Sequence, residues 1–217
     1  MITKMIAVDD IRLKNECEKQ NAEFCDFEAE DICGYQVLPG SNPGWQRGSP
    51  RNDSDDFPIT DHTTGTDSGY FMYASGVLID RELRALLASN DFRINSADKC
   101  LQFFFHQPAN FFGDLNVYIK QSDVNLTNLL PIWSDKFDID FYGVVWRKSQ
   151  IQIQNLHAFS FQVIFEQYVE SILPGNKYGV FIDDVQVKES YCLKPEDCDF
   201  ENGDTCESIA TFYMYNF

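Results

Sequence analysis

The chain has few basic residues for its length: 17 Lys and Arg stand against 34 Asp and Glu in 217 residues, a formal net charge of −17. A surface this acidic repels nucleic-acid phosphates and anionic lipid headgroups. Long apolar runs are also lacking, since a membrane span needs about 18 or more consecutive apolar residues and none occurs. We therefore predict no nucleic-acid partner, and attachment to a membrane only through parts outside this sequence.

The N-terminus lacks the apolar stretch and small-residue cleavage site of a secretory signal peptide, which taken alone indicates the cytoplasm. The cysteines indicate the opposite. There are seven, and none lies in the CxxC pair of a zinc ribbon or a thioredoxin motif. They are Cys17, Cys25, Cys33, Cys100, Cys192, Cys198 and Cys206. An odd number is awkward for a complete secreted protein.

An internal repeat accounts for the odd cysteine. Residues 6–17, IAVDDIRLKNEC, resemble residues 180–192, VFIDDVQVKESYC. Residues 25–33, CDFEAEDIC, resemble residues 198–206, CDFENGDTC, with the same C-x7-C spacing. Two matched blocks in the same order and at nearly the same offset are typical of tandem units.

We interpret the chain as a segment of a longer array of tandem units. Residues 1–17 form the tail of an upstream unit, residues 25–192 a complete unit, and residues 198–217 the start of the next. The complete unit then holds four cysteines, an even number, as a disulfide framework requires. Truncation explains the missing signal peptide, and the expected location is extracellular or the ectodomain of a membrane protein.

Short segments with apolar residues at every second position predict strands on which one face is buried. Turn-rich stretches separate them, and aromatic residues reach 15% of the chain. Many short strands without alternating helices predict an all-β fold, an antiparallel two-sheet sandwich. The residues predicted to lie in strands and to be buried between the sheets are Leu101, Phe103, Phe105, Leu115, Val117, Phe161, Val163 and Phe165.

Two further segments carry less regular signals. Phe159 extends the alternating set of the last of these strands by one position. Residues 80–90, DRELRALLASN, place Leu83, Leu86 and Leu87 at helical spacing and are the one helix-like segment.

Several motifs resemble the MAM domain, an extracellular module shared by meprins, neuropilins and certain receptor tyrosine phosphatases. They are CDFEAEDICGY from Cys25, Trp-Gln-Arg at 45–47, FPITDHTTGTDSGYFMYA at 57–74, CLQFFFHQ from Cys100, and FIDDVQV before Cys192. The match runs through the whole unit in order.

The resemblance implies a two-sheet antiparallel jelly roll with two disulfides, Cys25–Cys33 and Cys100–Cys192. Cys198–Cys206 would be the first bridge of the next unit, and Cys17 would have no partner in this chain. The alternative is that some of the cysteines are free thiols in the core.

Asp61, His62 and Ser68 are the only residues whose types and proximity suggest catalysis. Neighbouring strand residues point in opposite directions, so a nearby Asp, His and Ser do not by themselves make a triad. GxSxG and HExxH motifs are both absent. We therefore predict no catalytic residues, and we expect the Asp-His-Thr segment to tie a turn together through side-chain bonds to the backbone.

A pair of aspartates precedes the last cysteine of the unit. Strict alternation over residues 181–187 puts Asp183 on the same face as Phe181, Val185 and Val187, and Asp184 on the opposite face with Gln186. A carboxylate on a buried face is costly unless it is paired, hydrogen-bonded or bound to metal.

The resemblance to MAM domains and to calcium-bearing jelly rolls implies that Glu28, Asp61 and Asp183, together with backbone oxygens, ring one structural Ca²⁺. Oxygen ligands of this kind suit calcium. The alternative is that Asp183 is hydrogen-bonded to a Trp, a His or the backbone.

Two sequons, at Asn52 and Asn125, are acceptor motifs for N-glycans in a secreted chain, although such motifs also occur by chance. The stripe formed by Phe103, Phe105, Phe161 and Phe165 is expected to be core, with an apolar ligand groove as the alternative.

The function expected from the resemblance is a non-catalytic extracellular module that mediates cell adhesion or protein recognition. Its partners would be other cell-surface proteins, including a second copy of itself. One alternative is an accessory segment of a secreted or membrane-bound enzyme, which sets dimerisation or substrate access. Another is a calcium-bearing jelly roll that binds glycans, which would require exposed aromatics on one concave sheet.

Overall fold

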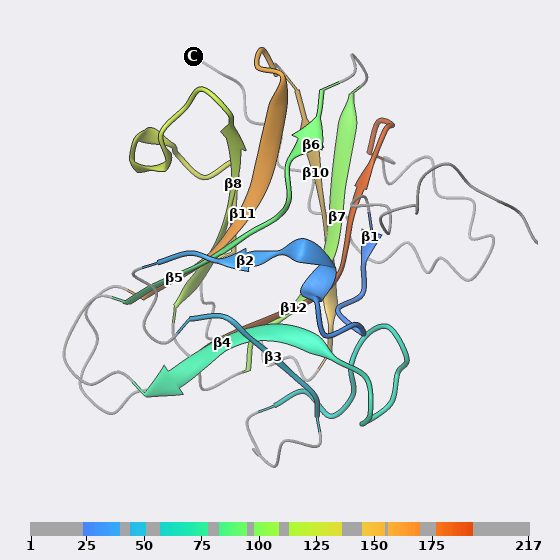
Figure 1. Ribbon diagram of the computed structural model, residues 1–217. Helices are drawn as coiled ribbons and strands as arrows, with labels where there is room; N and C mark the ends of the chain where they lie inside the picture. Colours follow the sequence, from blue (N-terminus) through green and yellow to red (C-terminus); the bar gives the residue numbers. More distant parts are fainter. Residues whose placement is uncertain are drawn as a thin grey trace, which may run out of the picture.

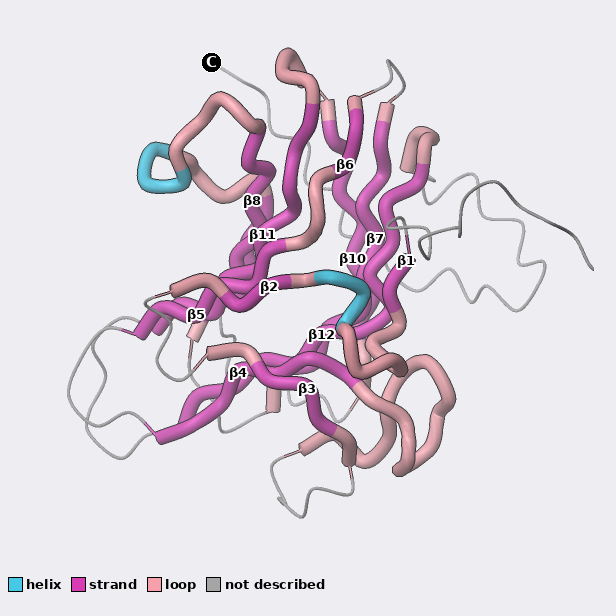
Figure 2. The backbone as a smooth tube through the Cα atoms, in the orientation of Figure 1, coloured by secondary structure: helices cyan, strands magenta, loops and turns pink. Residues whose placement is uncertain are grey.

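The computed structural model describes residues 24–39, 44–50, 57–77, 83–94, 98–108, 113–135, 145–154, 156–169 and 177–192. Almost all regular structure in these ranges is β-strand, arranged in two antiparallel sheets that pack face to face (Figures 1 and 2). The predicted all-β two-sheet sandwich is confirmed. The sequence pieces 1–17 and 198–217, with Cys17, Cys198, Cys206 and Asn52, lie outside the described residues.

The first sheet has the strand order β10-β7-β12-β4-β3, and β1 pairs with β12 beside β4. Its strands are β1 Phe24–Cys25, β3 Gln46–Gly48, β4 Phe71–Val77, β7 Lys99–His106, β10 Arg147–Ile153 and β12 Lys177–Lys188.

The second sheet has the order β2-β5-β11-β8-β9, and β6 pairs with β11. Its strands are β2 Gln36–Val37, β5 Leu83–Ala88, β6 Phe92–Arg93, β8 Asp114–Gln121, β9 Trp133–Asp135 and β11 Ser160–Val169. Two 3₁₀ turns, η1 Ile32–Gly34 and η2 Leu126–Asn128, complete the described elements. No helix in the described ranges has the length and apolar content needed to cross a bilayer.

The core lies between the inner faces of the two sheets. All eight residues predicted from the alternation lie in β7, β8 or β11, and all are buried. Phe103 shows how the faces meet: its ring packs edge-on against Phe165 and Trp133 of the other sheet, each at a centroid distance of 5.2 Å. The aromatic stripe is therefore core, as expected.

Residues 80–90 carried the one helix-like spacing in the sequence. In the described part of this segment the helical reading is wrong, because Leu83–Ala88 forms strand β5 between β2 and β11. Ala85 and Leu87 face the core, while Leu86 and Ala88 pack on the opposite side of the sheet against Tyr118 and Ile164. A strand buried on both faces loses its polar alternation, so its run of apolar residues imitates helical spacing.

Phe159 also departs from the alternation. Strand β11 begins at Ser160, and the Phe159 side chain is 94% exposed in the connection between β10 and β11. The apolar spacing continues one residue beyond the end of the sheet, where no opposite sheet covers it.

A polar network lies on the outer face of the second sheet. The Glu166 carboxylate, 2% exposed, accepts hydrogen bonds from Arg84, from the Asn116 amide at 2.9 Å and from the Tyr118 hydroxyl at 2.6 Å. Ser134 in turn donates to Asn116 at 2.6 Å. Each member of the network is satisfied by another, so this charge is stabilised inside the fold.

Candidate functional site

The Asp-His-Thr loop, residues 57–70, packs over the outer face of the first sheet. Phe71, Tyr73 and Phe181 point to this face because their strand neighbours point into the core. The Phe57 ring lies 5.9 Å from Phe71, 4.7 Å from Tyr73 and 5.2 Å from Phe181. These four aromatic rings seat the start of the loop on the sheet.

Asp183 is the anchor of this loop and has no exposed surface. Its carboxylate accepts hydrogen bonds from the backbone N–H groups of His62 at 2.9 Å, Thr63 at 3.3 Å and Asp184 at 2.8 Å. The Thr63 hydroxyl donates to it as well, at 3.4 Å. Backbone donors brought from a loop more than a hundred residues away thus stabilise the buried carboxylate.

A β-bulge sets the direction of both aspartates. The register of β12 against β7 shifts between Asp183 and Gln186, and Asp184 has a positive φ of 47°. One extra residue reverses the alternation, so Val185 faces the core while Phe181 faces outward. The expectation that Asp183 shares a face with Phe181 is correct, whereas the expectation that it shares one with Val185 and Val187 is wrong.

Asp184 belongs to the same site as Asp183 and does not lie on the opposite face. Its carboxylate accepts from the Thr63 hydroxyl at 2.8 Å and lies 2.5 Å from Nδ1 of His62. The His62 ring also stacks on Phe104, with centroids 3.4 Å apart. The alternation put Asp184 on the opposite face and gave no sign of Phe104, because nothing local to residues 181–187 marks the bulge.

Asp61 ties the loop to itself. Its buried carboxylate accepts from the backbone N–H of Thr64 at 2.6 Å, from the Thr64 hydroxyl at 2.6 Å and from the Thr66 N–H at 3.1 Å. A Cβ atom at Gly69 would lie 2.2 Å from the Asp61 carboxyl carbon, so only glycine allows this approach. The predicted turn held by side-chain bonds to the backbone is confirmed.

Glu28 connects the first disulfide loop to the same region. Its carboxylate accepts from the Tyr70 N–H at 2.8 Å, and Arg47 donates to the backbone oxygens of Phe27 at 2.7 Å and Glu28 at 2.5 Å. The Arg47 guanidinium also lies 3.4 Å from the centroid of the Tyr70 ring. The Trp-Gln-Arg motif marked Arg47 in the sequence without indicating this role.

The electrostatics of the site follow from burial and like charge. Burial, with a further contribution from the Asp184 charge, raises the pKa of Asp183 to about 8, although its backbone hydrogen bonds act in the opposite direction. Burial also raises the pKa of Glu28, and the Asp61 charge adds to the increase. The negative charge gathered here is thus only partly compensated by hydrogen bonds.

The predicted ring of Glu28, Asp61 and Asp183 is not assembled in the structure. Among the described residues, no three His, Cys, Asp or Glu side chains are grouped so as to hold a metal ion. Each of the three carboxylates instead accepts hydrogen bonds from backbone N–H groups, which is the alternative arrangement for Asp183.

Asp61, His62 and Ser68 do not form a triad. The His62 ring contacts Asp184 rather than Asp61, and the Ser68 hydroxyl donates to Asp67 at 3.0 Å. These contacts hold the Asp-His-Thr loop in place, and the Ser68 hydroxyl is not directed at the His62 imidazole.

Two disulfides close the unit. Cys25 is bonded to Cys33, with Cα atoms 5.8 Å apart, and Cys100 is bonded to Cys192, with Cα atoms 5.0 Å apart. These are the pairs that the resemblance implies. Disulfides persist in oxidising compartments, so they agree with an extracellular location.

The sequence of the unit matches a family model described as MAM domain, meprin/A5/mu, over residues 25–193. The chain belongs to the MAM family. The human MAM domain-containing glycosylphosphatidylinositol anchor protein 1 is 30% identical over 181 residues, which are 79% of this chain and 18% of that protein. Human meprin A subunit beta is 28% identical over 173 residues, which are 78% of this chain and 24% of that protein. The chain thus spans at most about a quarter of the length of these relatives.

Solved structures of other proteins share the two-sheet sandwich fold of this chain. The K1 cleaved adhesin domain of Lys-gingipain from Porphyromonas gingivalis W83 superposes with a TM-score of 0.52 at 14% identity, covering 77% of this chain and 98% of that one. At so low an identity the likeness concerns the fold alone.

Proposed function

We propose that this MAM domain is a non-catalytic extracellular recognition module that mediates cell adhesion or protein–protein contact. The observation that carries the proposal is the hydrogen bonding of the Asp-His-Thr loop. The carboxylates of Asp61 and Asp183 accept hydrogen bonds from the loop's own backbone. Such a loop presents a rigid surface and leaves no activated nucleophile, which suits recognition.

Bead aggregation tests this proposal. Beads coated with the chain should adhere to one another or to cells, and beads coated with the reduced, alkylated chain should not, because both disulfides are lost. If the coated beads adhered neither to one another nor to any cell type of a panel, the result would contradict the proposal. Adhesion among beads alone would identify the partner as a second copy of this chain.

The second candidate is an accessory segment of a secreted or membrane-bound enzyme. The similarity to meprin A subunit beta favours it. The two candidates differ in the domains that flank the unit in the full-length polypeptide, and a protease domain there would favour the accessory role.

Glycan binding has less support. The exposed aromatics of the described residues are Phe24 in β1, Phe159 before β11 and Tyr191 after β12. They come from different elements and do not form a platform on one sheet face, which stacking on a sugar would need.

We further propose that a calcium ion binds beside the Asp-His-Thr loop. The support is electrostatic: burial raises the pKa of both Asp183 and Glu28, a neighbouring carboxylate adds to each increase, and a divalent cation would relieve this repulsion. Calcium accepts backbone carbonyls and water among its ligands, so it does not need three carboxylates in contact. Glu28, Asp61 and Asp183 are the side chains that would contribute.

Thermal unfolding tests the calcium proposal. Calcium should raise Tm relative to a chelator, magnesium should do so less, and Asp183→Asn should remove most of the difference. Asp184 adjoins the site, so the matched control is Asp123→Asn, an exposed residue on the β8 side of the molecule. Identical melting curves with calcium and with chelator would refute the proposal.

Asn125 is proposed as an N-glycan acceptor. Asn125 and Thr127 are both exposed at η2, so the sequon is accessible. Chain secreted from animal cells should lose mass on treatment with an amidase that removes N-glycans. Asn125→Gln should abolish the part of the loss that the Asn52 sequon does not supply.

A further inference from the structure

The chain enters and leaves the sandwich at the same end of the first sheet. β1 is antiparallel to β12, with Phe24 opposite Gln186. Phe24 is therefore the residue of β1 nearer to the end where β12 finishes at Lys188 (Figure 1). Cys192 is held at that end too, because its disulfide partner Cys100 lies opposite Lys188 on β7.

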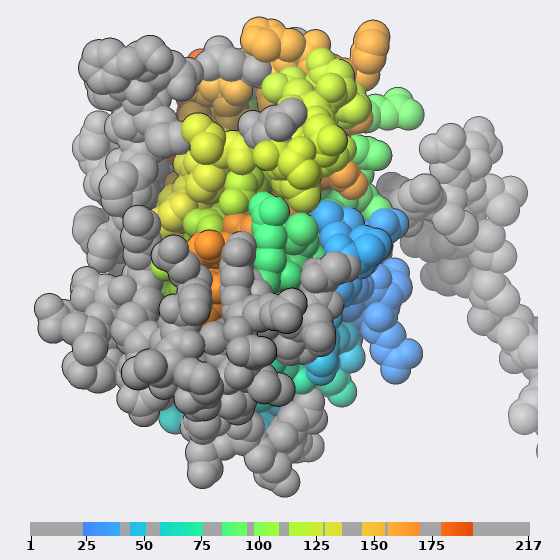
Figure 3. Space-filling view, turned by 90° about the vertical axis from the view of Figure 1, so that its left-hand side faces the viewer, coloured from blue at the N-terminus to red at the C-terminus, as the bar shows by residue number. Residues whose placement is uncertain are grey.

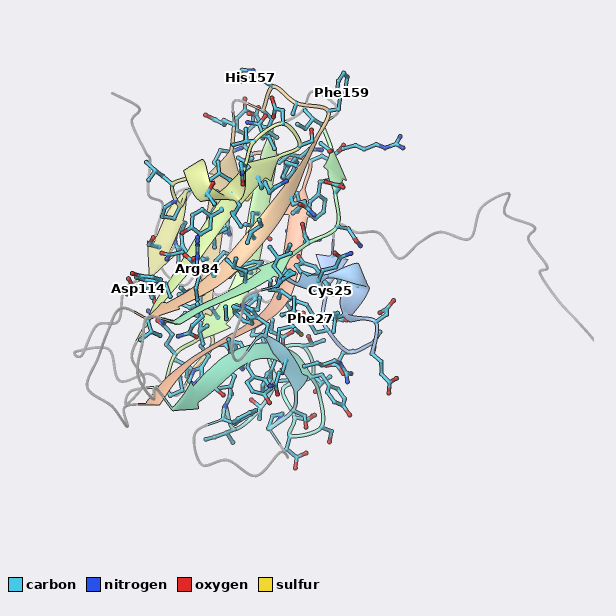
Figure 4. The ribbon with its side chains drawn as sticks, turned by 60° about the vertical axis from the view of Figure 1, so that its left-hand side comes forward. Cys25, Phe27, Arg84, Asp114, His157 and Phe159 are labelled. Atoms are coloured by element: carbon cyan, nitrogen blue, oxygen red, sulfur yellow. A yellow bond between two sulfur atoms is a disulfide. The ribbon has the colours of Figure 1, made fainter. Side chains whose placement is uncertain are left out.

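The β10–β11 connection projects from this same end. It begins there because Ile153, the last residue of β10, pairs with Lys99 at the start of β7. Residues of this region, drawn in orange, project at the top of the molecule in Figure 3. Figure 4 shows His157 and Phe159 at that end, with the Phe159 ring directed away from the sheets.

Two exposed aromatic side chains, those of Phe159 and Tyr191, lie toward this end, whereas Phe24 adjoins Cys25, which Figure 4 places well below Phe159. Phe159 is 94% exposed, Tyr191 68% and Phe24 43%. Tyr191 hydrogen-bonds Asp98 through its hydroxyl. The other large exposed hydrophobic side chains among the described residues are aliphatic: Val37, Ile59, Leu130 and Val145. Aromatic rings supply much of the binding energy at protein interfaces.

We propose that the end of the sandwich carrying Phe159 and Tyr191 is an interface for the neighbouring unit of the same polypeptide, the one that begins at Cys198. The inference rests on the tandem array. Five residues, LKPED, separate Cys192 from Cys198, and six extended steps span at most about 20 Å. The neighbouring unit therefore starts close to this end, and consecutive units meet there.

A small contact is sufficient for such an interface. A short tether gives the tethered partner an effective concentration of about a millimolar, so a weak apolar contact is populated without the area that a free dimer needs. Pro195 stiffens the tether and limits the orientations that it allows.

Hydrogen exchange on the full-length polypeptide tests the proposal against the 217-residue chain. Amides of residues 156–161 and 189–191 should exchange at least several-fold more slowly when the downstream unit is present. Phe159→Ser should abolish this protection and lengthen the maximum dimension seen by small-angle scattering. The unit itself should keep its Tm, because the replaced side chain is almost fully exposed.

The control is Val145→Ser, which removes a 66% exposed side chain just before β10, at the opposite end of the first sheet from Ile153. It should change neither the exchange nor the scattering. Equal exchange in both polypeptides would overturn the proposal, as would a full-length polypeptide without a downstream unit. Protection that grows with the concentration of the 217-residue chain would also overturn it, because the occupant would then be a separate copy. Bead adhesion is measured independently, so loss of the recognition function and loss of this interface are distinguishable.

Discussion

A single buried carboxylate, Asp183, organises the candidate site at the scale of the residue. It accepts hydrogen bonds from the backbone N–H groups of His62 and Thr63, although its strand is remote from them in sequence. An unsatisfied buried donor costs about 1–3 kcal/mol. Asp183 therefore determines the conformation of the loop, in addition to any role in binding a ligand.

Asp183→Ala should lower the free energy of unfolding by about 2–4 kcal/mol, because the N–H groups of His62 and Thr63 lose their acceptor. Urea unfolding in chelator measures this without a contribution from calcium. Asp183→Asn keeps one carbonyl acceptor and should lose less. Asp123→Ala, at an exposed position, should change the free energy by less than about 0.5 kcal/mol. Equal losses for Asp183→Ala and Asp123→Ala would contradict the anchoring role.

His106 makes the stability pH-dependent. Burial lowers its pKa below the ordinary value of 6.5, the nearby Arg147 charge acts in the same direction, and the Val145 carbonyl opposes both. Between its folded and unfolded pKa values the unfolded chain binds more protons, so stability is fully present above about pH 6.5 and is lost as pH falls. His106→Phe should flatten the unfolding free energy in this window. His157→Asn, at an exposed position, should not.

The elements show where strand periodicity is a sufficient guide and where it is not. β7, β8 and β11 each have one face toward the core, and their alternation matches the structure. β5 is covered on both faces, so its apolar residues no longer alternate. β12 carries a bulge, and every side-chain direction beyond it is reversed relative to a regular strand.

The two disulfides should differ in what they contribute. They close loops with separations of 8 and 92 residues, for which chain entropy gives about 2.5 and about 4.6 kcal/mol. Each pair joins one buried and one half-buried cysteine, so local packing costs are matched. Replacing Cys100 and Cys192 by Ala should therefore destabilise the unit by about 2 kcal/mol more than replacing Cys25 and Cys33. Equal destabilisation by urea titration would contradict the chain-entropy account.

The whole molecule carries a net charge of −17, which repels itself in the compact state. Raising NaCl from about 20 mM to about 300 mM shortens the screening length from about 20 Å to about 6 Å. Tm at pH 7 should therefore rise with salt. The control is the same series near pH 4.4, the isoelectric point of the sequence, where the rise should disappear. A salt effect of equal size at both pH values would show that net charge is not its cause.

The sequence by itself determined the all-β sandwich, the family and the buried faces of the central strands, because period-two alternation and the ordered motifs are local properties of the chain. Only the tertiary structure decided the geometry of the candidate site. Whether Asp184 joins Asp183 depends on a bulge, and the backbone donors that Asp183 accepts from lie more than a hundred residues away in the sequence. Phe159 follows the alternation of β11 yet remains exposed, because burial requires an opposing sheet as well as an apolar side chain.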